Sequence, residues 1–295
     1  MNRYSRADLH VHSDASDGVH SSPELVRKAE SARLSHIAIC DHDTTAGITD
    51  ALQYCKNSDI NTVVVPAVEI GTELSDSSMK WARTSRLQDG EVHILGYGID
   101  PDPDDEQLDE MLEHLQDNRH QRLLSILHNF RKMGMYISED EVNELSGDSQ
   151  SPGRPHVAKM LVHRGYCEDV PEAFEKFLSV GRPGYVPRER PDSRKAVEAI
   201  CQAGGMAILA HPGLLTRPLD MVKLLQEQGI SGVEVVHQNH SFSDVSTLIR
   251  HCRRRGLLCT GGSDYHGRKR DPEIGEIGIP RQWAETMLEE IHCNR

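Results

Sequence analysis

The feature that most constrains the fold of this chain is a repeated alternation of short apolar, β-branched runs with helical segments. Seven such runs occur, at 7–12, 36–40, 62–69, 91–98, 206–211, 232–236 and 257–262. Strands that alternate with helices are typical of a parallel sheet whose faces the helices cover. Seven or eight such units favour closure of the sheet into a barrel, and an open doubly wound sheet is the alternative. The sequence therefore predicts an α/β fold.

The strand pattern breaks between about 102 and 187, where the apolar residues recur with a helical period. Helix signals inside this stretch include a capping box from Ser138 to Glu141 and prolines at predicted helix starts. We therefore expect a helical insert at 102–187, with the barrel formed by 1–101 and 188–295. The polar connection at 71–90 is long, and either a lid or plain surface would fit it.

Composition limits the classes of partner. Lys and Arg total 33 against 46 Asp and Glu, a net charge of −13, which disfavours tight binding of long nucleic acid through a basic face. Small anions remain possible, because two or three divalent ions would place about four to six positive charges in one pocket. The seven cysteines are scattered and never spaced Cys-x-x-Cys, and no run approaches the ~18 apolar residues of a membrane span. We expect a soluble, cytoplasmic protein.

Histidines and carboxylates gather at the predicted strand ends. His10 and His12 are two residues apart on the first strand, so both side chains face one side and can bind one ion. Asp17 follows in the next loop. The candidates at or near the later strands are Asp41, His42, Asp43, Glu69, His93, His211, His237, His240, Asp264 and His266. Active sites of parallel barrels lie where the strand ends converge, so these residues predict one metal site.

The alternative for each of these residues taken singly is a satisfied core histidine or a solvated acid in a turn. Seven coincidences at seven predicted strands are improbable. Glu69 and Asp264 each end an apolar run, where an unpaired charge is costly to bury, and Glu69 suits a bridging role. A mixed imidazole and carboxylate set fits Zn²⁺, Mn²⁺ or Fe²⁺.

Six motifs resemble, in order, those of the polymerase and histidinol phosphatase (PHP) superfamily. They are DLHVHSDASDG (8–18), ICDHDTT (39–45), PAVEI (66–70), VHILGYGID (92–100), LAHPG (209–213) and GSDYHG (262–267). Three further segments resemble one branch, the 3′,5′-nucleoside bisphosphate phosphatases and 5′-to-3′ exonucleases of short RNA or DNA. They are SPGRPHVAKMLV (151–162), KFLSVGRPGYVP (176–187) and GVEVVHQNH (232–240).

The resemblance implies a distorted (β/α)7 TIM-like barrel, the PHP fold, with an inserted helical subdomain. It also implies up to three metal ions. His10, His12, Glu69 and Asp264 would hold the first ion, Glu69, His93 and His211 the second, and Asp17, His42 and His266 the third. The residues that it implies for contact with substrate phosphate are Arg154, His156, Arg182 and His240. For Arg154 the alternative is a solvated charge at a helix start.

The resemblance further implies hydrolysis by a metal-bound hydroxide, with no protein nucleophile. We expect two to three divalent ions, Mn²⁺ first and Zn²⁺ or Fe²⁺ as alternatives. The general acid is either a histidine not saturated by metal or a metal-bound water.

Four functions compete at this point. The first is removal of the 3′-phosphate from a nucleoside 3′,5′-bisphosphate, and the second is 5′-to-3′ exonuclease action on short RNA or DNA oligonucleotides. Histidinol phosphatase is a weaker third, since the insert motifs point elsewhere. A metal-stabilised PHP module without activity is the alternative from another class, and the complete ligand set counts against it. We expect a small phosphorylated nucleotide or short oligonucleotide as partner, no membrane and no obligate protein partner.

Overall fold

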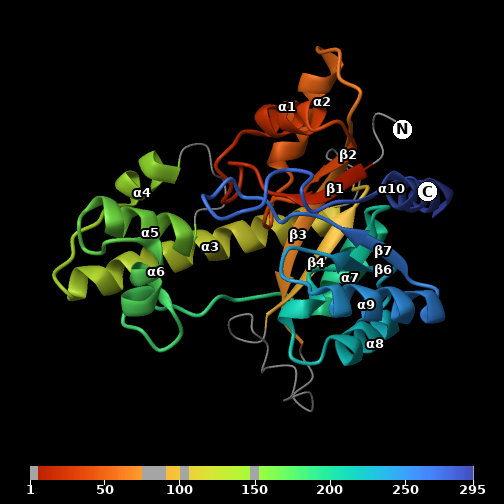
Figure 1. Cartoon of the computed structure of the whole chain (residues 1–295). Coiled ribbons are helices and arrows are strands. Elements are labelled where there is room, and N and C mark those ends of the chain that lie inside the picture. The colour runs from red at the N-terminus through yellow and green to blue at the C-terminus, as the bar shows by residue number, and fades with distance from the viewer. Residues whose placement is uncertain (1–5, 75–90, 100–105, 147–152, 295) are drawn as a thin grey trace.

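The structure is a computed structural model that describes residues 6–74, 91–99, 106–146 and 153–294. The predicted start of the insert at residue 102 and most of the 71–90 connection lie outside the described residues. The helices and strands are arranged as a barrel with a helical extension on one side (Figure 1). None of the described helices is both long and apolar enough to cross a membrane.

The eight strands form one sheet in the order β7-β6-β5-β4-β3-β2-β1-β8. They are β1 (Arg6–Val11), β2 (Leu34–Ile39), β3 (Val63–Thr72), β4 (Val92–Tyr97), β5 (Met206–Leu209), β6 (Gly232–Val236), β7 (Leu258–Gly261) and β8 (Ile279–Pro280). The segment after β7 returns to β1, where Asp264 N–H donates to the His10 carbonyl at 2.8 Å and His12 N–H donates to the Tyr265 carbonyl at 2.8 Å. These bonds nearly close the sheet, which confirms the predicted α/β barrel. The sheet also contains a short eighth strand, β8, that was not among the seven predicted strands.

Of the seven predicted strands, one departs from the predicted parallel order, and the added strand β8 is also antiparallel to its neighbour β1. β1, β2 and β3 are parallel, as are β5, β6 and β7, but β4 is antiparallel to both β3 and β5. The expectation of a fully parallel sheet is therefore wrong at β4. Thr72 at the end of β3 pairs with Val92 at the start of β4, so the chain re-enters the sheet at the edge where it left, and this reverses the strand direction. As a result, the start of β4 lies at the same edge as the ends of the parallel strands.

Six helices cover the outside of the barrel (Figure 1). They are α1 (Ser22–Ser31), α2 (Ala46–Lys56), α7 (Ser193–Gln202), α8 (Pro218–Gln228), α9 (Phe242–Arg255) and α10 (Arg281–Asn294). Polar side chains cap two of these helices, with a capping box between Ser21 and Glu24 at α1 and the Asp192 carboxylate accepting from Arg194 N–H at α7. Aliphatic side chains such as Ile94, Ile200 and Leu209 fill the space between these helices and the sheet.

The predicted helical insert is present beside the barrel. It contains α3 (Glu106–Lys132), α4 (Glu139–Ser146), α5 (Arg154–His163), α6 (Val170–Ala173) and a π-helical turn, η3 (Phe174–Leu178). The first half of α3 packs Leu108 and Leu115 into the barrel core, whereas the second half packs Leu127 and Phe130 into a separate core with α5 and α6. One helix thus joins both cores. The exact limits of the insert stay a prediction.

Candidate active site

The site is centred on Glu69 of β3, whose side chain is 1% exposed. Its two carboxylate oxygens lie within 3.4 Å of ring nitrogens of five histidines, which are His10, His12, His42, His93 and His211. The nearest contact, to His93 Nδ1, is 2.7 Å. One carboxylate carries one negative charge and cannot satisfy five buried imidazoles. The arrangement fits the bridging role predicted for Glu69, which stays a prediction.

Two further carboxylates complete the cluster. Asp264 Oδ1 lies 3.3 Å from His12 Nε2, and Asp17 Oδ1 lies 3.2 Å from His266 Nε2. Ligand atoms that lie within 4.8 Å of one another form three groups, His10 with His12 and Glu69, Glu69 with His93 and His211, and His12 with Asp17, His42 and His266. The structure thus brings together all nine residues predicted to bind metal. That each is a ligand stays a prediction.

Unsatisfied atoms inside the cluster test whether metal ions fit it. His42 Nδ1 and Asp17 Oδ1 are buried and make no hydrogen bond of good geometry among the described residues, although they lie 3.1 Å from Glu69 Oε2 and 3.2 Å from His266 Nε2. His10 Nε2 and His12 Nε2 face each other at 3.1 Å, which is unfavourable for two lone pairs unless a proton or a cation lies between them. Buried polar atoms in native proteins are almost always paired. The donor set therefore fits divalent ions.

The pKa values of the cluster describe its charge without metal. Burial would raise the pKa of Glu69, but the neighbouring charges of His93, His42 and His10 lower it well below its usual value. Burial opposes the charged form of His93, yet Glu69 and Glu91 raise the pKa of His93 to about 10. Burial lowers the pKa of His42 to about 3. The carboxylates of the cluster thus favour positive charge at this site.

Glu234 orients two of the histidines, and the sequence analysis gave it no role. It is fully buried in β6, where Oε1 lies 2.9 Å from His10 Nδ1 and Oε2 accepts from the His211 backbone N–H at 2.7 Å. A carboxylate on the second ring nitrogen commonly fixes the orientation of a metal-binding histidine. The signal in the sequence was a lone acid inside the apolar run GVEVV (232–236).

The backbone is strained at three positions in the cluster. Asp43, His211 and Asp264 have positive φ angles of 56°, 26° and 54°, and Arg33 is the fourth such non-glycine residue in the described part of the chain. The Asp43 N–H donates to the Glu69 carbonyl at 3.0 Å, which helps to hold the first of these conformations. Strained backbone tends to gather at functional sites.

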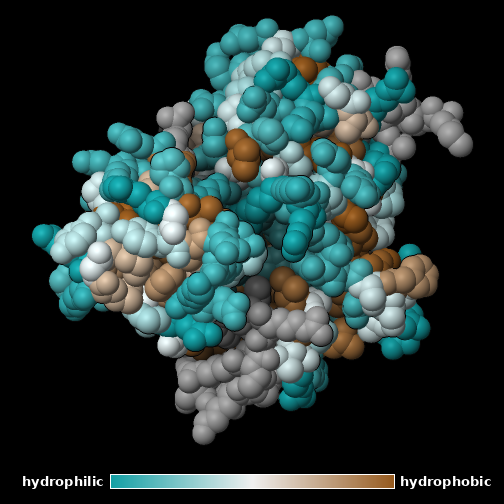
Figure 2. Space-filling model, turned by 60° about the vertical axis from the view of Figure 1, so that its left-hand side comes forward, coloured by the Kyte–Doolittle hydropathy of each residue, from teal (hydrophilic) through white to brown (hydrophobic). Residues whose placement is uncertain are grey.

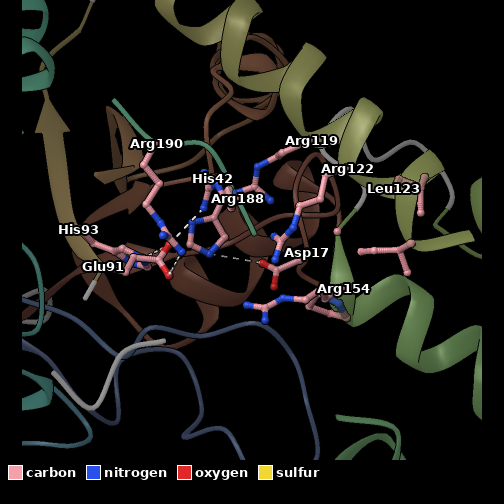
Figure 3. Close-up of a pocket in the computed structure, with 13 residues that line it drawn as sticks. Asp17, His42, Glu91, His93, Arg119, Arg122, Leu123, Arg154, Arg188 and Arg190 are labelled. Atoms are coloured by element: carbon pink, nitrogen blue, oxygen red, sulfur yellow. Dashed lines mark hydrogen bonds and ion pairs between the residues drawn. The ribbon is translucent and has the colours of Figure 1, made fainter. Parts of the chain in front are cut away.

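A cavity of about 180 Å³ adjoins the cluster. Asp17, His42 and His93 face it from the cluster, and five arginines line it, which are Arg119, Arg122, Arg154, Arg188 and Arg190 (Figure 3). They come from α3, α5 and the segment before α7. In the space-filling view, the face shown is mostly hydrophilic, and apolar residues are scattered over it (Figure 2). Although the chain has a net charge of −13, five of its arginines gather at this one cavity.

Most of these arginines have carboxylate partners in the cavity wall. Arg119 Nε lies 2.5 Å from Asp43 Oδ2, Arg188 pairs with the same oxygen, and Arg190 Nη2 lies 3.0 Å from Glu91 Oε2. Such pairs hold the guanidinium groups in place along the wall.

Arg122 differs from its neighbours. Its Nε donates to the Val186 carbonyl at 2.8 Å, and its Nη2 is buried without a hydrogen-bond partner among the described residues. Burial and the nearby charges of Arg154 and Arg188 lower the pKa of Arg122. A buried cation beside other cations favours an anion in the space that they share.

The family follows from the sequence match that accompanies this geometry. Residues 8–202 match the model of the PHP domain. The chain belongs to the PHP family. A 3′,5′-nucleoside bisphosphate phosphatase of Chromobacterium violaceum is 31% identical over 263 residues, covering 88% of this chain and 86% of the relative. The 5′-3′ exoribonuclease Rnm of Escherichia coli is 30% identical over 292 residues, covering 95% and 94%.

A solved structure gives the same assignment. A protein of Bifidobacterium adolescentis, named a metal-dependent phosphoesterase, superimposes with a TM-score of 0.81 at 28% identity and covers 98% of this chain and 96% of its own. This PHP protein is therefore a metal-dependent hydrolase that acts on phosphoester bonds. The predicted family, fold and reaction class are confirmed. The inactive PHP module is therefore no longer an alternative.

Among the four predicted substrate contacts of this PHP phosphoesterase, Arg154 lines the cavity. Its Nη1 donates to the Leu178 carbonyl at 3.3 Å, and its guanidinium lies 5.8 Å from the ring centres of Phe174 and Tyr185. Such packing argues against a solvated charge. Arg182 is exposed and is not among the described residues that line the cavity.

The two predicted histidine contacts are engaged with the backbone. His156 Nδ1 accepts from Gly153 N–H at 3.1 Å at the start of α5, and burial lowers the pKa of His156 to about 4. His240 uses both ring nitrogens, since Nε2 accepts from Gly213 N–H at 2.9 Å and Nδ1 lies 2.9 Å from the Val235 carbonyl. His237, a candidate after the sixth predicted strand to which the family resemblance gives no metal or phosphate contact, lies 3.3 Å from Asp264 Oδ2. A substrate contact by His156 or His240 stays a prediction.

Proposed function

We propose that this PHP phosphoesterase removes the 3′-phosphate of a nucleoside 3′,5′-bisphosphate. The observation that carries the proposal is Arg122 Nη2, which is buried beside Arg154 without a hydrogen-bond partner among the described residues, in a cavity that also opens onto Asp17, His42 and His93 of the cluster. One phosphate would lie at the cluster and the other against the two arginines. A substrate with two phosphates on one ribose uses both positions, and a relative at 31% identity is named for that reaction.

The protein's own groups have distinct parts in this reaction. Two to three divalent ions, with Mn²⁺ as the first candidate, would bind here. Their ligands would be the three groups around Glu69 and His12 together with Asp264. Such ions supply an activated water molecule and neutralise phosphate oxygens. Arg122 and Arg154 would bind and orient the remote phosphate through charged hydrogen bonds. Glu234 and Asp41 hold the histidines and the Asp17 loop in place, Asp41 by accepting from Ser13 N–H at 2.8 Å.

The second candidate is 5′-to-3′ exonuclease action on short oligonucleotides. The relative named 5′-3′ exoribonuclease Rnm, which matches 95% of this chain, supports it. The cavity volume of about 180 Å³ favours the smaller substrate, since it leaves little room for more than the phosphorylated end of one nucleotide. Histidinol phosphate fits worst, because its ammonium group would lie among five arginines.

A screen with Mn²⁺ that measures both released inorganic phosphate and released mononucleotide separates these substrates. It compares adenosine 3′,5′-bisphosphate, 5′-phosphorylated di- and trinucleotides, histidinol phosphate and an aryl phosphate. We expect the highest kcat/KM for the bisphosphate, with adenosine 5′-monophosphate as product. A preference for the trinucleotide would establish the exonuclease instead, and turnover of only the aryl phosphate would disprove both.

A further inference from the structure

A continuous chain of ion pairs joins the insert to the centre of the cluster. It runs along the cavity wall through Arg119, Asp43, Arg188, Glu91, His93 and Glu69. Figure 3 shows Glu91 between His93 and the guanidinium groups of Arg188 and Arg190. Arg119 belongs to α3, and Glu69 is the carboxylate that two metal groups share. The arginine-lined cavity and the histidine cluster are therefore physically connected.

Glu91 lies at the middle of this chain and forms ion pairs with three side chains at once. Oε1 lies 2.9 Å from His93 Nε2 and 3.2 Å from Arg188 Nη1, and Oε2 lies 3.0 Å from Arg190 Nη2. The local fold leaves room for these contacts at Gly71. A Cβ there would lie 2.9 Å from Glu91 Oε1 and 2.8 Å from Arg188 Nη1, so a side chain at this position would displace the pair.

We infer that Glu91 is a positioning residue that couples the metal cluster to the phosphate cavity. His93 points Nδ1 at Glu69 and Nε2 at Glu91, so the nitrogen not aimed at the metal group is held by a carboxylate. The same carboxylate fixes Arg188 and Arg190 in the cavity wall. An ion that fixes His93 also fixes Glu91 beside Arg188 and Arg190, and an anion that fixes these arginines also fixes Glu91 beside His93. Such coupling between two sites is reciprocal. The inference rests on the proposed function only for the identity of the anion.

The competing explanation is that Glu91 merely neutralises two buried arginines. Glu91→Asp separates the two roles, because it keeps the negative charge near Arg188 and Arg190 but withdraws the carboxylate from His93 by one methylene group. Glu91→Gln removes the charge while keeping the shape. The matched control is Glu189→Gln, which makes the same chemical change at an exposed position between the two arginines.

The first measurement is Mn²⁺ affinity without nucleotide, by calorimetry on the full chain. Both Glu91 variants should bind one ion at least about tenfold more weakly than wild type, the size usual for loss of a residue that orients a ligand. The Glu189→Gln variant should stay within about twofold of wild type. A neutralising role predicts instead that Glu91→Asp binds Mn²⁺ like wild type. That result would overturn the inference, and Glu91→Asp decides the matter if Glu91→Gln does not fold.

The second measurement is the affinity for adenosine 5′-monophosphate with and without Mn²⁺. In wild type, Mn²⁺ should tighten nucleotide binding, and in Glu91→Gln the tightening factor should fall at least about threefold. An unchanged factor would exclude coupling through Glu91. If wild type does not bind the nucleotide, the proposed substrate is wrong, and inorganic phosphate replaces it as the probe. The Mn²⁺ affinities then still test Glu91 separately from the proposed function.

Discussion

The histidine cluster and the arginine cavity adjoin each other but are built from different parts of the chain. The cluster stands on strand ends and on the loops that follow them, and its residues come from β1, β3, β4 and the segments after β2, β5 and β7. The cavity takes its arginines from α3, α5 and the segment before α7, where the insert meets the barrel. The barrel thus supplies the cluster, whereas three of the five cavity arginines, Arg119, Arg122 and Arg154, come from the insert.

This contrast assigns chemistry to the barrel and selectivity to the insert. Loss of a cluster residue should impair every substrate, since all phosphate esters need the same reacting centre. Loss of a cavity arginine should impair only substrates that carry a second phosphate. Four measurements can break this division or sharpen it.

Removal of metal should have the largest effect. Protein loaded with Mn²⁺ should contain two to three ions per chain, because the ligand atoms form three groups and Glu69 belongs to two of them. Chelation should abolish turnover of all substrates, and Mn²⁺ should restore it. Elemental analysis and kinetics on one sample test this. Fewer than one ion per chain at full activity would remove the cluster from the mechanism.

Asp264→Asn should come next, with turnover reduced by about two orders of magnitude or more, because a charge is lost 3.3 Å from His12 Nε2 at the reacting centre. Asparagine tolerates the left-handed backbone at this position, where φ is 54°, so the variant should fold. The measurement is kcat on the bisphosphate and on an aryl phosphate, with circular dichroism for folding. Near wild-type turnover on both would show that Asp264 is not a ligand.

The sequence predicts which residues gather in the cluster because two simple rules apply. The spacing of His10 and His12 places both side chains on one face of a strand, and the convergence of strand ends in a barrel brings the other candidates towards them. His93 was assigned to the site without the reason, which is the antiparallel direction of β4. Arg119 and Arg122 could not be identified, since on a long polar helix they resemble solvated charges. Their role depends on how α3 docks, which is a long-range property.

Arg154→Ala should produce a smaller and selective loss. It should weaken transition-state binding of the bisphosphate by about 2–3 kcal/mol, the scale of a lost charged hydrogen bond, and Arg122→Ala should do the same. Hydrolysis of an aryl phosphate, which has no second phosphate, should change much less. The measurement is kcat/KM on both substrates.

The matched control for these arginines is Arg131→Ala, an exposed arginine on the same helix as Arg122. It should leave kcat/KM on both substrates close to wild type. Equal losses on the two substrates in Arg154→Ala would instead place this arginine at the metal cluster or in the fold. No loss on either would make it a solvated charge at the start of α5.

His240→Ala should have the smallest effect, and on stability more than on catalysis. Both ring nitrogens bond to backbone groups, at Gly213 and Val235, so the ring ties the segment after β5 to the end of β6. Two lost hydrogen bonds at about 1 kcal/mol each should lower the free energy of unfolding by about 2 kcal/mol. The KM for the bisphosphate should change little. A large rise in KM at unchanged stability would show that His240 contacts phosphate, as the sequence predicted.

The pH dependence of this stability difference identifies the cause. Burial lowers the pKa of His240 from 6.5, so the folded state prefers the neutral ring and the unfolded state binds the proton more readily. Wild-type stability from this group is therefore complete above the unfolded pKa and is lost as the pH falls through the folded pKa. The stability difference between wild type and His240→Ala should thus be larger at about pH 8 than at about pH 5. Denaturant unfolding at both pH values decides whether His240 is a buried backbone clamp or a free contact for phosphate.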